Sequence, residues 1–121
     1  MTELPQRSDV PVPQGRYLPA ISHDGLVFSA GMTPRVGGQL RVRGIIGDGL
    51  EAHQARNAAG IAASNALLAV ADAAGGLDRI DRCLRMTVYL ACAADFTRHS
   101  EVADGASEAL RAWLGDRGDV V

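Results

Sequence analysis

Alanines at helical spacing fill residues 51–74, and this segment constrains the fold more than any other part of the chain. They lie mostly three or four residues apart, which is the spacing of one helix face. The alanines that make up this face are Ala55, Ala58, Ala59, Ala62, Ala66, Ala69 and Ala73. Because their side chains are small, the helix is expected to approach a sheet closely. Gly75 and Gly76 follow where a helix C-terminus is expected.

Two apolar runs before this helix flank the dipeptide Asp24-Gly25. Glycine adopts the positive φ that a tight turn needs, so the pattern predicts a β-hairpin formed by residues 16–22 and 26–32. A glycine-containing turn at residues 36–39 then precedes a third predicted strand at residues 40–45, in which apolar residues and arginines alternate.

A β-rich run and a second apolar periodicity follow the helix. Residues 82–91 have Thr, Val and Tyr at their centre and predict a strand. Residues 96–114 predict a helix that ends at Gly115. The predicted order is therefore β-β-β-α-β-α, an α+β fold with two main helices on one face of a mixed β-sheet.

The 121 residues are expected to form a single domain with one core. Within it, residues 1–15 carry prolines among polar residues and predict an extended N-terminal arm. Because only residues 115–121 follow the second predicted helix, the strands that would close the sheet are expected to be absent after Val121.

The charge balance argues against nucleic acid as the main partner. The formal net charge is −2 and the sequence pI is about 5.8, and no basic stripe is present. No apolar run reaches the roughly 20 residues that span a bilayer. Since the N-terminus also lacks a signal-peptide pattern, a cytoplasmic protein without membrane contact is expected.

The cysteines and histidines form no recognisable metal or catalytic motif. Cys83 and Cys92 flank the fourth predicted strand, which would hold them about 30 Å apart, so two reduced thiols are expected rather than a disulfide. His23, His53 and His99 are scattered, which favours surface positions over metal ligation. Glycine motifs for nucleotides are absent as well, and no metal or organic cofactor is expected.

Several segments, taken in order, resemble the RidA (YjgF) family, which is also labelled the endoribonuclease L-PSP family. The segments that carry the resemblance are Gly15-Arg16-Tyr17, the sequence VFSAGMTP at residues 27–34, residues 51–58, 77–80 and 85–90, Asp95-Phe96, and residues 102–107. Together they extend over roughly residues 15–118. Each motif is short, and their order and spacing make the combination specific.

This resemblance implies a chorismate-mutase-like (RidA-type) fold and a homotrimer with ligand clefts between its subunits. It implies a deaminase, a hydrolase that converts reactive 2-imino and enamine acids such as 2-iminobutanoate and 2-iminopropanoate to 2-keto acids and ammonia. In the family, a strand arginine after the second helix holds the substrate carboxylate through a bidentate pair, and an acidic residue on the final strand orients the water. Both positions would lie beyond Val121, so the catalytic residues are not identified in this sequence.

The resemblance also implies substrate-binding residues near the first strands and in the second helix, and these are Tyr17, Ser29, Gly31, Met32 and Asp104. Most of them have a structural alternative. Tyr17 could pack at a subunit interface, Ser29 could bond within its own strand, and Gly31 could belong to a β-bulge rather than admit a ligand. Asp104 could equally be a solvated helix carboxylate.

Three positions depart from the family pattern. Ala30 stands in place of a serine, Met32 in place of a glutamine, and Asp104 in place of an asparagine, where its charge would oppose an anionic substrate. These departures leave three hypotheses open. The protein could be a RidA-like hydrolase, a non-catalytic trimeric module that binds small carboxylate-bearing metabolites, or an endoribonuclease, which the acidic pI disfavours.

Overall fold

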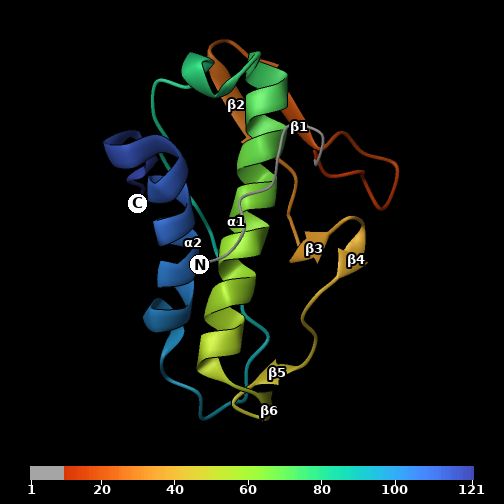
Figure 1. Ribbon diagram of the computed structural model, residues 1–121, viewed down its shortest axis with the longest axis vertical. Coiled ribbons are helices and arrows are strands. Elements are labelled where there is room, and N and C mark those ends of the chain that lie inside the picture. Colours follow the sequence, from red (N-terminus) through yellow and green to blue (C-terminus); the bar gives the residue numbers. More distant parts are fainter. Residues whose placement is uncertain (1–9) are drawn as a thin grey trace.

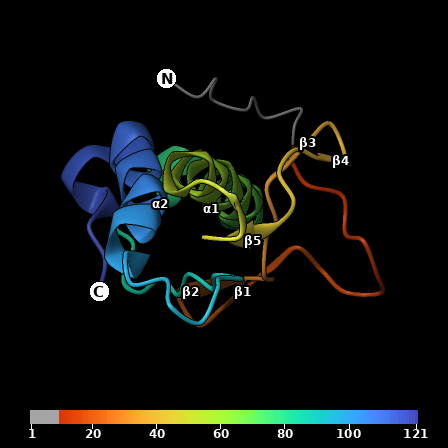
Figure 2. The ribbon, with the colours of Figure 1, turned by 90° about the horizontal axis from the view of Figure 1, so that it is seen from below.

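Two helices form one layer of the protein, and short strands form the other. The computed structural model describes residues 10–121, so most of the predicted arm lies outside the described residues. The helices are α1 (Ala52–Ala74) and α2 (His99–Leu114), and the principal strands are β1 (Ala20–His23) and β2 (Leu26–Ser29). The helices run side by side (Figure 1), and Figure 2 shows β1, β2 and the extended segment 82–92 on one face of the helix layer. The predicted α+β class, with both helices on one face, is therefore confirmed.

Helix α1 begins and ends where the sequence predicts. The backbone N–H of Glu51, the residue before the helix, donates to the Oε1 of Gln54 at 2.9 Å. Gly75 ends the helix at φ 95°, and its N–H donates to the Ala71 carbonyl at 3.0 Å. Since α1 packs against α2 on one side and against β1 and β2 on another, small residues are buried around much of its circumference.

The two helices approach each other at a pair of buried glycines, Gly60 of α1 and Gly105 of α2. A Cβ atom at Gly105 would overlap the carbonyl oxygen of Arg56, and one at Gly60 would lie 3.2 Å from the carbonyl oxygen of Gly105. The close contact therefore depends on the absence of a side chain at Gly105. The α2 residues that complete the buried interface are Val102, Ala106, Leu110 and Leu114.

Helix α2 begins at His99, later than the predicted start near residue 96. The reason is a turn in which the N–H of Phe96 donates to the Ala93 carbonyl at 3.0 Å. Arg98 then keeps a non-helical conformation, with φ −94° and ψ 48°. The helix ends at Leu114, and Gly115 follows it as predicted.

Strands β1 and β2 form the predicted hairpin. Asp24 (φ 52°) and Gly25 (φ 79°) both have positive φ, as a two-residue turn between antiparallel strands requires. Pairing extends from His23 opposite Leu26 to Ala20 opposite Ser29. Strand β2 therefore stops at Ser29, before the predicted limit at residue 32.

The predicted single strand at residues 40–45 is wrong. The elements found there are β3 (Arg35–Val36), β4 (Gln39–Leu40), β5 (Ile45–Ile46) and β6 (Gly49–Leu50), which pair locally as β3 with β4 and β5 with β6. Gly44 at φ 128° and Gly47 at φ 87° interrupt the extended backbone. The alternation of apolar residues therefore does not produce one continuous strand, because glycines with positive φ lie on both sides of the buried Ile46.

Residues 82–92 are extended, but they pair with other segments only near their two ends. At one end, the Cys83 N–H donates to the Arg117 carbonyl at 2.7 Å, and Met86 and Val121 are joined at 3.1 Å. At the other end, the Ile46 N–H donates to the Ala91 carbonyl at 2.9 Å. Within the part of the chain that the structure describes, no backbone hydrogen bond is found for residues 87–90. The strand predicted at residues 82–91 is therefore wrong, because within residues 10–121 its centre finds no partner strand and only Cys92 forms an isolated β-bridge, with Ile46.

Short 3₁₀ helices follow both main helices, and they are η2 (Leu77–Arg79) and η3 (Gly115–Gly118). Cys83 and Cys92 are both free thiols. Across residues 10–121, no helix combines the length and the apolar character needed to cross a membrane.

Candidate functional site

The loop that follows β2 is fastened to the centre of α1 by one buried side chain. Asn65 is 6% exposed, and its Nδ2 donates to the carbonyl of Thr33 at 3.1 Å and to that of Arg35 at 2.9 Å. At the start of the loop, the Ala30 N–H donates to the Pro19 carbonyl at 2.8 Å and continues the hairpin ladder. The backbone of residues 30–35 is thus held at both ends.

Ser64, the neighbour of Asn65, holds the other side of α1. It is 3% exposed, and its Oγ accepts a hydrogen bond from the Nε1 of Trp113 at 3.3 Å. The two buried polar residues of α1 therefore hydrogen-bond to different parts of the fold. Asn65 bonds to the loop after β2, and Ser64 bonds to α2. Neither residue belongs to the site predicted from the sequence. A signal existed in the two adjacent polar residues inside an alanine-rich helix.

Three of the predicted site residues lie together at this edge. Ser29 ends β2 and is exposed, Gly31 is exposed, and Met32 is half-buried. Gly31 does not have a positive φ, and a Cβ placed on it would meet no atom within 4 Å. Among the described residues, nothing therefore requires glycine at position 31, and the space above it is open.

Tyr17 lies close to the same end of the hairpin, two residues before Pro19. Its hydroxyl accepts a hydrogen bond from the Gln14 N–H at 3.2 Å, and its ring lies over Gly15. Tyr17 as a whole is 46% exposed, and it lines a shallow hollow of about 500 Å³ together with Pro13 and Leu18. Tyr17 therefore folds back on its own loop, with part of its ring accessible.

Asp104 lies exposed on α2. That helix packs mainly on α1 and η3, whereas β1 and β2 pack on α1. Within one chain, the contacts between elements bring Ser29, Gly31 and Met32 together and do not bring Asp104 to them. A site that included all of these residues would have to form between two chains, and the assignment of the site stays a prediction.

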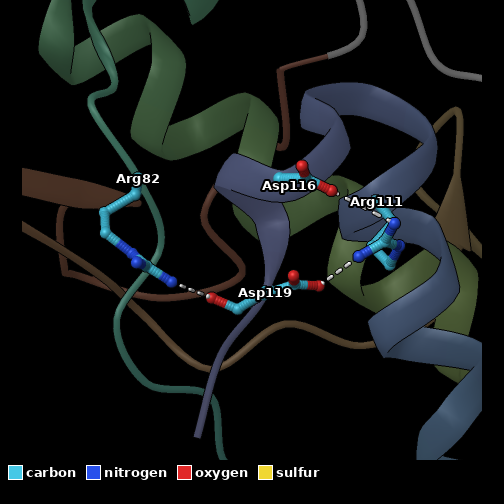
Figure 3. Close-up of polar contacts among 4 residues, drawn as sticks. All are labelled: Arg82, Arg111, Asp116 and Asp119. Carbon is cyan, nitrogen blue, oxygen red and sulfur yellow. Dashed lines mark hydrogen bonds and ion pairs between the residues drawn. The ribbon is translucent and has the colours of Figure 1, made fainter.

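A second hollow, of about 570 Å³, lies between residues 82–85 and residues 119–121. Two of its charged residues, Arg82 and Asp119, already have polar partners. The Arg82 Nη2 donates to the Asp119 carbonyl at 3.1 Å, and Arg111 contacts the carboxylates of Asp119 at 2.6 Å and Asp116 at 3.3 Å (Figure 3). The hydrogen bond that Arg111 donates to the Asp119 carboxylate raises the pKa of the Arg111 guanidinium, so this group stays charged. These contacts hold residues 115–121 against the extended segment.

Cys83 lines the same hollow and has a less reactive environment than a free surface thiol. Burial raises the pKa of its thiol above the ordinary value of 9.0, and the nearby Arg117 and Arg82 oppose this effect. Arg117 itself donates to the carbonyl of Ile80, which ties η3 to the start of the extended segment. Across residues 10–121, no group of three or more His, Cys, Asp or Glu side chains is placed to hold a metal ion.

Comparison with known proteins identifies the fold. No protein-family model matches the chain, and no curated protein matches it. Among solved structures, a protein of unknown function from Agrobacterium tumefaciens superposes with a TM-score of 0.83 at 28% identity, over 88% of this chain and 69% of that one. A protein from Shewanella oneidensis with the provisional name endoribonuclease superposes with a TM-score of 0.82 at 24% identity, over 98% of this chain and 77% of that one. The chain therefore has the α+β fold of RidA (L-PSP) type.

Proposed function

We propose that the protein hydrolyses small 2-imino and enamine acids to 2-keto acids and ammonia, in clefts between the subunits of a homotrimer. The observation that carries this proposal concerns Gly31. This residue lies in a loop held by hydrogen bonds at both ends, a Cβ atom on it would point into open space, and its backbone conformation does not require glycine. A glycine of this kind suits a position where a ligand or a neighbouring chain approaches the backbone. The RidA-type fold supports the same chemistry.

The chemistry asks little of the protein. Water adds to the carbon of the C=N bond, and the resulting carbinolamine releases ammonia to leave the keto acid. The protein must hold the substrate carboxylate and keep the carbon accessible to water. In this proposal, Ser29 and the backbone around Gly31 line the cleft, Met32 forms its apolar floor and Tyr17 covers its mouth. The group that transfers protons is not assigned.

An exposed apolar face supports the homotrimer. Ile21 and Phe28 are cross-strand partners in the hairpin, and they are 54% and 65% exposed. Since neighbouring residues of a strand point to opposite faces, the half-buried Val27 lies on the face toward α1 and Phe28 on the outer face. An exposed apolar patch of this kind is typical of a protein interface. Phe28 immediately precedes Ser29, so the candidate site would lie at the rim of such an interface.

The test measures ammonia release from 2-iminopropanoate, generated in place by an amino-acid oxidase. We expect release above the buffer rate for the wild type, and a loss of on the order of tenfold for Gly31→Leu if the side chain occupies the cleft. Gly31→Leu should keep the melting temperature, because the added atoms point into open space. No excess over the buffer rate in the wild type would exclude the hydrolase.

The second candidate is a non-catalytic module that binds small carboxylates. It is favoured by the half-buried Met32, because a thioether at the floor of the cleft can pack against a ligand but cannot hydrogen-bond like an amide. This function predicts that pyruvate or 2-ketobutanoate raises the melting temperature while no ammonia is released. A panel of such acids that produces no shift would exclude it.

RNA cleavage is a third candidate, and it rests on the provisional name of the Shewanella oneidensis protein. The net charge of −2 argues against it, because the affinity for RNA depends largely on neutralising phosphates.

A further inference from the structure

Cys92 is held rigidly at the far end of the extended segment. It forms an isolated parallel β-bridge with Ile46, in which the Ile46 N–H donates to the Ala91 carbonyl and the Ala93 N–H donates to the Ile46 carbonyl, both at 2.9 Å. The residue is half-buried. Because backbone hydrogen bonds fix both neighbours of Cys92, its side chain has a defined direction.

That side chain meets the first residue of α2. The Sγ of Cys92 lies 3.5 Å from the Nε2 of His99, within hydrogen-bond distance for sulfur. The His99 ring is fixed on a second side by Phe96, whose ring centroid lies 5.4 Å away at an interplanar angle of 72°. The Cys92 thiol and the His99 imidazole are therefore both held in place by contacts with other residues. The two residues lie seven positions apart in the chain.

The imidazole side of this pair is open to solvent. His99 and Arg98 are exposed, and the guanidinium of Arg98 lies 5.9 Å from the centroid of the Phe96 ring. Arg98 forms an ion pair with Glu101 at 3.3 Å, so the Glu101 carboxylate already has a charged partner. A thiol within hydrogen-bond distance of an imidazole nitrogen can pass its proton to that nitrogen when its sulfur attacks an electrophile.

We propose that Cys92 and His99 form a reactive thiol site that captures small electron-poor alkenes. The imidazole Nε2 accepts the thiol proton, and Sγ attacks the β-carbon of the alkene. An S–C bond forms as the C=C π bond opens, and the imidazolium returns its proton to the α-carbon, so no other reactant is needed. This activity is independent of imine hydrolysis, because it uses none of the residues near Gly31.

The chain contains its own reference thiol. Cys83 lies at the opposite end of the same extended segment and is also half-buried, but its neighbours are Arg82 and Arg117, and no described histidine contacts it. Burial raises the pKa of the Cys83 thiol and disfavours its reactive form. Within one molecule, Cys92 therefore has the neighbouring histidine that the proposal requires, and Cys83 does not.

The experiment exposes the folded protein to limiting N-ethylmaleimide and follows both cysteines by peptide mass spectrometry. Cys92 should be modified faster than Cys83 by on the order of tenfold or more, and His99→Gln should slow Cys92 by a similar factor while Cys83 stays unchanged. The matched control is His23→Gln, because His23 is an exposed histidine in the hairpin turn, at the opposite end of the structure from the start of α2 (Figure 1). This control should leave both rates unchanged.

Equal rates at the two cysteines of the wild type would overturn the proposal, whatever the variants do. A Cys92 rate that His99→Gln leaves unchanged would overturn the role of the imidazole. If that variant unfolds, Cys83 becomes faster as well, and the wild-type ratio then decides the question.

Discussion

Asn65 is buried in an alanine-rich helix, and its amide reaches two carbonyls of the loop that follows β2. A buried amide without partners costs more free energy than an apolar side chain of the same size. Here both donor hydrogens are used, so the amide ties the loop to α1 rather than destabilising the helix. The position of Gly31 and Met32 therefore depends on a residue that does not belong to the predicted site.

Replacing Asn65 with Ala should lower the free energy of unfolding by about 1–3 kcal/mol, because two carbonyls lose their donor. It should also weaken the binding of any ligand at Gly31. Thermal unfolding and the ammonia assay measure the two effects. The matched control is Asn57→Ala, since Asn57 is an exposed asparagine of the same helix and its replacement should change little. Equal effects of both variants would show that the hydrogen bonds of Asn65 are unimportant.

At the scale of residues, the sequence identifies only part of the candidate site. Ser29, Gly31 and Met32 were selected because they lie within one short motif, and the fold keeps them together, while their role as a site stays a prediction. Asn65 could not be assigned its role, because its partners are backbone carbonyls of a loop about thirty residues away, whose position no periodicity reveals. The proximity of Cys92 and His99 depends in the same way on a turn between strand and helix.

The packing of α1 on α2 is decided by the two glycines at their crossing. An alanine in place of glycine normally stabilises a helix by up to about 1 kcal/mol. At Gly105 this gain competes with an overlap between the new Cβ and the Arg56 carbonyl oxygen. A backbone oxygen cannot rotate away as a flexible side chain can, so the helices would have to separate and expose part of their buried interface.

Gly105→Ala should therefore destabilise the protein by about 1–3 kcal/mol in spite of its better helix propensity. Gly60→Ala is the comparison on the facing helix, where the new Cβ would lie 3.2 Å from the nearest oxygen. Its effect should be close to neutral, because the propensity gain and the mild crowding offset each other. Urea denaturation of both variants measures the difference. A Gly105→Ala variant as stable as the wild type would contradict the close approach of the helices.

At the scale of elements, local signals predicted local structure well. The ends of α1 and the turn of the β1–β2 hairpin follow from glycine and from periodicity, and both are confirmed. The strand predicted at residues 40–45 failed because positive φ at Gly44 and Gly47 divides the region. The pairing of residues 82–92 was not predictable, because its partners are Ile46 and residues 117–121, which are distant in the sequence.

The whole molecule presents an apolar outer face on its hairpin, and this face is where the proposed trimer would form. Ile21 and Phe28 together offer a patch that one subunit leaves open to water. The fold was predicted from the order of motifs, and the superposed structures confirm it. The homotrimer stays a prediction, and this exposed face is the surface on which it is proposed to assemble.

Phe28→Asp should convert the trimer to a monomer, because assembly would bury an unpaired carboxylate at the interface. Light scattering of the purified protein measures the change in mass. Val36→Asp is the matched control, since Val36 is 45% exposed on β3, away from the hairpin face. A wild type that is already monomeric would contradict the assembly, and a trimer that survives in Phe28→Asp would place its interface elsewhere.

The extended segment 82–92 obtains its two sets of hydrogen bonds at different moments of protein synthesis. Residues 91–93 bind Ile46, which the ribosome has already made when they emerge. Cys83 and Met86 can form their hydrogen bonds only after Arg117 and Val121 have been made. Those two residues follow α2 and are added a few seconds later, at a translation rate of ~5–20 residues per second. If each contact forms as soon as both of its partners are available, the segment docks first at its later end and then at its earlier end, against the direction of translation. The start of the segment therefore stays without its backbone partners until α2 and η3 have been made.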